Sequence, residues 1–183
     1  EIVFGRSPKD DILCTPFLHT ENRSVLGMIN WLQSRTQFQS CYRFSRAASR
    51  QASPNIGDCR AVNKLVRAIK AAPVALHFWP LKGPLQLLGF PDASYKNNDD
   101  KSSQRALTIF LAEGRCARAS TDARGSLIEY ESHKITQTTM STTLAELYAQ
   151  MKCFGTGLFL EGLWACISRF ASTDRCQQPC YNS

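Results

Sequence analysis

The chain has 183 residues, of which 43% are hydrophobic and 20% are charged. These proportions predict a folded globular protein and exclude an intrinsically disordered chain. The formal net charge of +7 favours a polyanionic partner, nucleic acid first. Glycines and Glu161 interrupt the longest apolar stretch, from about 154 to 167, so it is too short to cross a bilayer. We therefore expect no membrane partner.

The first residues contain no Met and lack the basic and apolar regions of a signal peptide. We therefore expect an intracellular chain, in the cytoplasm or nucleus, that is a fragment or a processed piece of a longer protein. For such a chain, eight irregularly spaced cysteines predict reduced thiols. Cys176 and Cys180 lack a second pair at zinc-finger spacing, which argues against zinc. A secreted, disulfide-bonded protein stays open as an alternative.

The first part of the chain is predicted to be helical. Residues 1–20 are interpreted as an irregular lead-in, with Pro8 and Pro16 as helix breakers. The spacing of apolar residues then predicts helices from Glu21, over 38–52 and over 58–72. Pro73 ends the last of these helices and marks the candidate domain boundary.

After Pro73 the apolar pattern becomes that of strands, and a long helix follows from about Thr142. Trp31, Trp79 and Trp164 fall in apolar patterns and are predicted to be core residues. The fold class is therefore mixed α/β, with N-terminal helices, three to four strands and a long helix. Strands are predicted over 74–79, 85–90, 106–111 and 127–133, and domains over 1–73 (helical), 74–168 (strands and long helix) and 169–183 (irregular tail).

Two acids are candidates for chemistry. Asp92 follows the strand predicted over 85–90, and Glu146 lies in the first turns of the long helix. Brought together, two such carboxylates can hold a divalent metal over a phosphodiester. Each acid also has a purely structural interpretation. Asp92 can be a strand-ending turn residue, and Glu146 can form a capping box with Thr143.

Basic residues recur on one face of each of two predicted helices. Such stripes can follow a phosphate backbone, or they can be ordinary solvated helix faces. As a nucleic-acid contact they would bind the phosphates of a nucleic-acid strand. The stripes are Arg43, Arg46 and Arg50 on the second helix, and Arg60, Lys64 and Arg67 on the third.

Several segments, in order and spacing, resemble the ribonuclease H domain of copia-type LTR retrotransposon polyproteins. They are Asp92-Ala-Ser-Tyr95, the polar turn 97–100, Ser102-Ser-Gln104, Tyr130-Glu-Ser-His-Lys134 and Ser141-Thr-Thr-Leu-Ala-Glu-Leu-Tyr148. Upstream, Arg23-Ser-Val-Leu-Gly-Met-Ile-Asn-Trp-Leu32 and the segment 61–70 resemble the end of the reverse transcriptase in the same polyproteins. The resemblance covers roughly residues 21–168.

The resemblance implies a mixed sheet with its first three strands antiparallel, and hydrolysis of RNA in an RNA–DNA hybrid. It implies Mg²⁺, or Mn²⁺, held by Asp92 and Glu146, with no small-molecule cofactor. The family's third metal-binding aspartate ends a fourth strand, and Asp174 is the local candidate, although residues 169–172 do not form a strand pattern. A fourth acidic or histidine position is missing. We therefore expect little or no hydrolysis, with a non-catalytic basic nucleic-acid-binding protein as the alternative.

Overall fold

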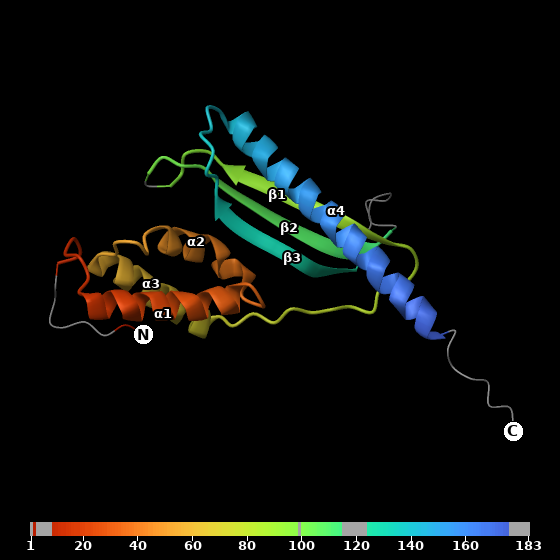
Figure 1. Cartoon of the computed structure of the whole chain (residues 1–183), viewed down its shortest axis with the longest axis horizontal. Coiled ribbons are helices and arrows are strands. Elements are labelled where there is room, and N and C mark those ends of the chain that lie inside the picture. Colours follow the sequence, from red (N-terminus) through yellow and green to blue (C-terminus); the bar gives the residue numbers. More distant parts are fainter. Residues whose placement is uncertain (1, 3–8, 99, 115–123, 176–183) are drawn as a thin grey trace, which may run out of the picture.

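The structure is a computed structural model that describes residues 2, 9–98, 100–114 and 124–175, without the side chains of 170–175. Helices come first and last, and a sheet lies between them (Figure 1). The mixed α/β class is therefore as predicted. The elements are α1 (Pro16–Gln33), the short 3-10 helix η1 (Phe38–Ser40), α2 (Cys41–Ser49), α3 (Ile56–Ala71), β1 (Leu85–Ser94), β2 (Gln104–Glu113), β3 (Gly125–Lys134) and α4 (Thr142–Arg175).

The first helix starts earlier than the sequence predicted. It begins at Pro16, where the side chain of Thr15 caps it by accepting a hydrogen bond from the Leu18 N–H at 3.3 Å. Interpreting Pro16 as a helix breaker was wrong. Proline is favourable in the first helical turn, because its missing N–H would have no helical partner there and its φ is already suitable.

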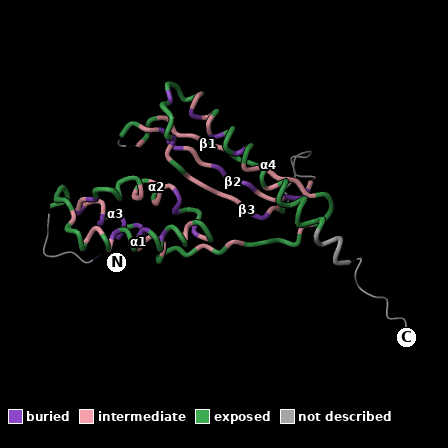
Figure 2. The backbone as a smooth tube through the Cα atoms, in the orientation of Figure 1, coloured by how far each residue is buried: buried purple, intermediate pink, exposed green. Residues whose placement is uncertain are grey.

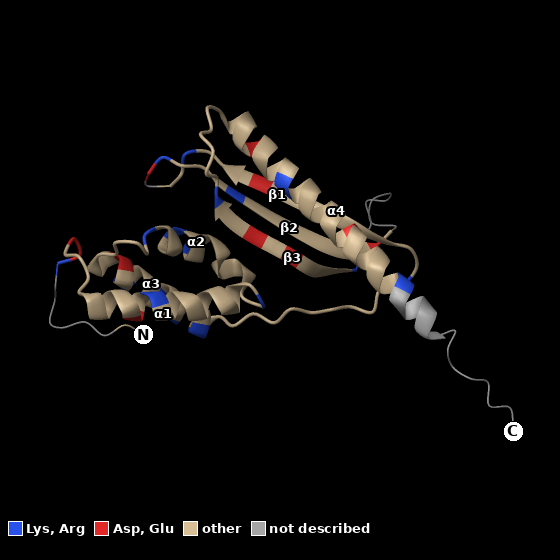
Figure 3. Ribbon diagram, viewed as in Figure 1, with Lys and Arg blue, Asp and Glu red and all other residues tan. Residues whose placement is uncertain are grey.

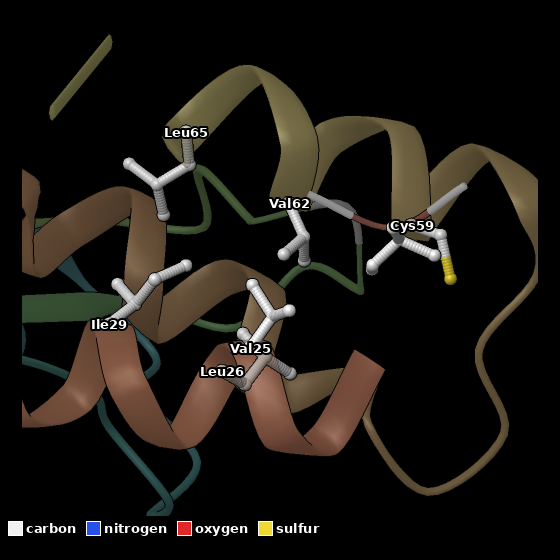
Figure 4. Packing of buried hydrophobic residues seen from close by; sticks show 7 residues of the cluster. Val25, Leu26, Ile29, Cys59, Val62 and Leu65 are labelled. Atoms are coloured by element: carbon white, nitrogen blue, oxygen red, sulfur yellow. The ribbon is translucent and has the colours of Figure 1, made fainter. Parts of the chain in front are cut away.

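The three N-terminal helices share a hydrophobic core of their own. The apolar stripe of α1 faces the stripe of α3, and the side chains interdigitate (Figure 4). Burying each large aliphatic side chain contributes roughly 1.5–3 kcal/mol, so this contact holds α1 and α3 together. The buried members from these helices are Val25, Leu26 and Ile29 of α1 and Cys59, Val62 and Leu65 of α3.

Within the described residues, the sheet has three antiparallel strands in the order β1-β2-β3. Position 92 of β1 pairs with Ala106 of β2, which in turn pairs with Ser132 of β3. Helix α4 packs on β1 and β2, whereas α2 packs on β3 (Figure 1). A second core forms under α4 from Leu107 and Ile109, and Figure 2 shows buried positions along β2.

The segment 74–79, predicted as a strand, has no regular structure. It lies between Pro73 and Pro80, and prolines at both ends remove donors that a sheet ladder would use. Individual hydrogen bonds connect this segment to the rest of the chain instead. The Gln37 side chain donates to the Val74 carbonyl at 3.2 Å, and the Trp79 N–H donates to the Ser126 hydroxyl at 3.0 Å.

Helix α4 places small residues against the sheet. Ala145, Ala149 and Cys153, spaced by four, are buried there. The helix continues to Arg175, so residues 169–175 are not the irregular tail that was predicted, while 176–183 lie outside the described residues.

Burial of the tryptophans was also predicted wrongly, because the exposed fractions are 63% for Trp31, 50% for Trp79 and 51% for Trp164.

Candidate nucleic-acid interface

Asp92 lies within β1, two residues before its end, and is exposed. Side chains of a strand alternate between the two faces of the sheet. Leu87, Gly89 and Pro91 line a groove under α4, so the alternation places Asp92 on the opposite face. On that face Asp92 lines a different cavity, together with Tyr42 of α2.

Glu146 lies on the α4 side of the sheet and is half-buried. It is one turn before Gln150, which lines the groove between α4 and β1. The predicted capping box of Glu146 with Thr143 is wrong. The helix begins at Thr142, so Thr143 is already inside it, and the Ser141 hydroxyl caps it by accepting from the Leu144 N–H at 3.1 Å.

The two candidate metal ligands therefore belong to opposite faces of one sheet. A two-metal site needs several carboxylates that converge on ions about 4 Å apart. Asp174 is in the last turn of α4, preceded by helix, and its side chain lies outside the described part. In the described ranges no three His, Cys, Asp or Glu residues are grouped so that they could hold a metal ion. The donor set of Asp92 and Glu146 thus does not fit the implied Mg²⁺ or Mn²⁺.

The predicted basic stripes have a different outcome, because four of the six residues come together. Figure 3 shows Lys and Arg along α2 and α3. A groove of 350 Å³ lies between these helices, and we call it the α2–α3 groove. Between Cys41 and Lys70 the chain has seven basic residues and one acid, Asp58, so most of the net charge is concentrated here. The predicted residues that line the groove are Arg43, Arg46, Arg50 and Lys64.

The acid in this region offsets one positive charge and leaves the groove lining with a positive excess. Asp58 forms an ion pair with Arg50 at 2.9 Å and a capping box with Asn55 at the start of α3. The remaining two stripe residues lie outside the groove lining. Arg60 points to the N-terminal segment and pairs with Asp10 at 2.6 Å, and Arg67 is on a later turn of α3.

One residue of the groove was missed at the sequence level. Tyr42 lines the α2–α3 groove and also the cavity of Asp92. The guanidinium of Arg46 lies 6.0 Å from the centre of its ring. An aromatic ring beside basic residues is a surface on which a base can stack. Its position four residues before Arg46 on a helix was the available signal.

Comparisons with protein-family models, with curated proteins and with solved structures found no match to this chain. In the part that the structure describes, none of the helices is both long and apolar enough to span a membrane.

Proposed function

We propose that this chain is a ribonuclease H-like fragment of a retrotransposon polyprotein that binds nucleic acid without hydrolysing it. The binding surface is the α2–α3 groove, in the part that resembles the end of a reverse transcriptase. The observation that carries the proposal is the convergence of Arg43, Arg46, Arg50 and Lys64 on that groove.

The order of elements supports the proposed ancestry. Three strands that are antiparallel and adjacent in chain order are followed by a helix that lies across them. This is the arrangement that the resemblance implied for the first part of the ribonuclease H domain. The ancestral reaction is metal-dependent cleavage of RNA in an RNA–DNA hybrid.

The positions of the acids support the proposed absence of hydrolysis. Carboxylates on opposite faces of a sheet cannot bridge a pair of ions, and each metal must be held by several ligands. Binding has no such requirement. A basic groove attracts a phosphate backbone through charge alone, and the released counterions supply much of the affinity.

The test is fluorescence anisotropy with a labelled RNA–DNA hybrid, titrated at several salt concentrations. We expect Arg43→Ala/Lys64→Ala to weaken binding. The slope of log K against the logarithm of the salt concentration should become less steep, by about 0.9 for each lost phosphate contact. The matched control is Lys9→Ala/Arg23→Ala, which removes one Lys and one Arg that are exposed outside the groove. Equal losses in both double variants would refute the groove as the binding surface.

A further inference from the structure

A smaller pocket of 130 Å³ lies beside the α2–α3 groove. It is lined by α2, by Asn98, Asp100 and Ser102 from the turn between β1 and β2, and by Lys134, the last residue of β3. Arg46 and Arg50 line both the pocket and the groove, so the two are adjacent. Among its described lining residues, three are basic and one, Asp100, is acidic. Its polar walls are completed by Ser45, Ser49, Asn98, Ser102 and Gln104.

Hydrogen bonds hold the walls of this pocket in place. Gln104 is buried, and its side-chain amide donates to the Ser45 hydroxyl of α2 at 3.1 Å and to the Ser132 hydroxyl of β3 at 2.9 Å. The Asn98 amide donates to the Ser102 hydroxyl at 3.0 Å. The pocket therefore lies at a hydrogen-bonded junction between α2 and the sheet.

The acid in the pocket is itself held by donors. Asp100 pairs with Lys134 and accepts from the Ser102 N–H at 3.1 Å. Lys134, and then Ser102, keep the pKa of this carboxyl well below its ordinary value, so Asp100 is ionised at neutral pH. Asp58, outside the lining, pairs with Arg50, so three cations stand against two anions and the described lining keeps a positive excess.

We propose that this pocket binds the terminal phosphate monoester of a nucleic-acid strand that lies in the α2–α3 groove. The ligand class rests on the proposed function, whereas the pocket rests on its own lining. A monoester carries a charge of roughly −1.5 to −2 at pH 7, and Arg and Lys donate charge-assisted hydrogen bonds to such oxygens. The strand continues on both sides of an internal phosphodiester, so that group fits the larger groove. A pocket of 130 Å³ fits a single phosphate group at the end of a strand.

The experiment compares three versions of one RNA–DNA hybrid whose DNA strand ends in hydroxyls, in a 5′-phosphate or in a 3′-phosphate. Each version competes with a labelled hybrid in anisotropy measurements at fixed ionic strength. We expect one phosphorylated version to bind about tenfold more tightly than the hydroxyl version, which corresponds to about 1.4 kcal/mol. Equal affinity of all three versions would overturn the proposal.

Four variants separate a pocket from general charge attraction. Lys134→Gln should abolish the preference for the phosphorylated end, while Lys134→Arg should keep it. Asp100→Asn removes the negative charge and should raise the preference. Arg43→Ala/Lys64→Ala should weaken all three hybrids equally and leave their ratio unchanged. A preference that persists in Lys134→Gln, or that falls in Asp100→Asn, would contradict the assigned site.

A small probe tests the pocket without any strand. Phenyl phosphate, at constant ionic strength, should raise the melting temperature of the wild-type chain and not that of Lys134→Gln. If it does so while no hybrid binds, the proposed function fails and the phosphate pocket stands. If hybrids bind in a salt-dependent way but neither phenyl phosphate nor a terminal phosphate has an effect, the pocket fails and the proposed function stands.

Discussion

Gly89 of β1 and Cys153 of α4 lie so close that a Cβ atom at position 89 would be 2.6 Å from the Cys153 sulfur. This contact shows which face of β1 meets α4. Because side chains alternate along a strand, the face of Gly89 is also that of Leu87 and Pro91, and Asp92 belongs to the other. One close contact therefore helps to place the two candidate acids on opposite sides of the sheet.

The first prediction concerns this contact. Gly89→Ala should lower the free energy of unfolding by about 1–3 kcal/mol, because the added methyl overpacks the interface of α4 with β1. The cost should shrink when Cys153→Ala is introduced as well, since the two residues are in direct contact. Urea unfolding of the four chains measures this coupling.

The control for this prediction is Gly155→Ala in the same helix. No atom lies within 4 Å of a Cβ at position 155, so the methyl meets open space. Alanine is the better helix former, and this variant should gain roughly 0.5–1 kcal/mol. A destabilised Gly155→Ala, or an unaffected Gly89→Ala, would contradict the packing described for α4.

The second prediction concerns hydrolysis. A labelled RNA–DNA hybrid incubated with the chain and Mg²⁺ or Mn²⁺ should remain intact, because Asp92 and Glu146 do not converge on one ion. Asp92→Asn and Glu146→Gln should bind the hybrid as the wild type does. Cleavage that disappears in Asp92→Asn would prove the non-catalytic assignment wrong, and gel electrophoresis of the RNA strand shows either result.

The third prediction concerns the capping of α3. Asn55 accepts a hydrogen bond from the Asp58 N–H at 2.8 Å, and Asp58 accepts one from the Asn55 N–H at 3.0 Å. Asn55→Ala should therefore cost about 1 kcal/mol of stability, as is typical for a lost N-cap. Ser53→Ala, an exposed change in the same turn, should stay within about 0.5 kcal/mol of the wild type in thermal or urea unfolding. Equal effects of the two changes would argue against the capping box.

The fourth prediction concerns thiol reactivity. Burial raises the pKa of the Cys41 thiol to about 11, and burial together with a hydrogen bond to Cys14 raises that of Cys59 to about 12. Only the thiolate attacks a disulfide reagent. Among the cysteines that the structure describes, the exposed Cys166 should therefore react first at pH 8, and Cys41 and Cys59 only after unfolding. Mass spectrometry of the modified chain distinguishes these sites, and rapid labelling of Cys59 would be the contrary result.

These thiols also give stability a dependence on pH. The folded state raises their pKa values above the ordinary value of 9.0, so folding favours the neutral thiol. Their contribution to the free energy of unfolding is complete below about pH 9 and is lost as the pH rises toward 11 to 12. Cys41→Ala should accordingly show a shallower alkaline decline of unfolding free energy than the wild type.

The helices and the three strands of the described sheet were largely predictable. The stripe of Val25, Ile29 and their neighbours, and the alternation around 127–133, are local patterns with periods of 3.6 and 2 residues. The segment 74–79 was predicted wrongly, because an apolar pattern without a partner strand forms no ladder. Exposure of Trp164 was not predictable either, since α4 buries only its small-residue stripe, and neighbours in space decide which stripe that is.

The candidate sites show the same division. The sequence alone determined that basic residues recur on two helix faces and that two acids follow apolar patterns. Only the tertiary structure decided that Arg43 and Lys64 share one groove and that Asp92 and Glu146 do not share a face. The physical reason is that periodicity is local, whereas strand pairing and helix docking join residues far apart in the chain. A shift of one residue in the register with which β1 pairs to β2 would have turned Asp92 to the other side of the sheet.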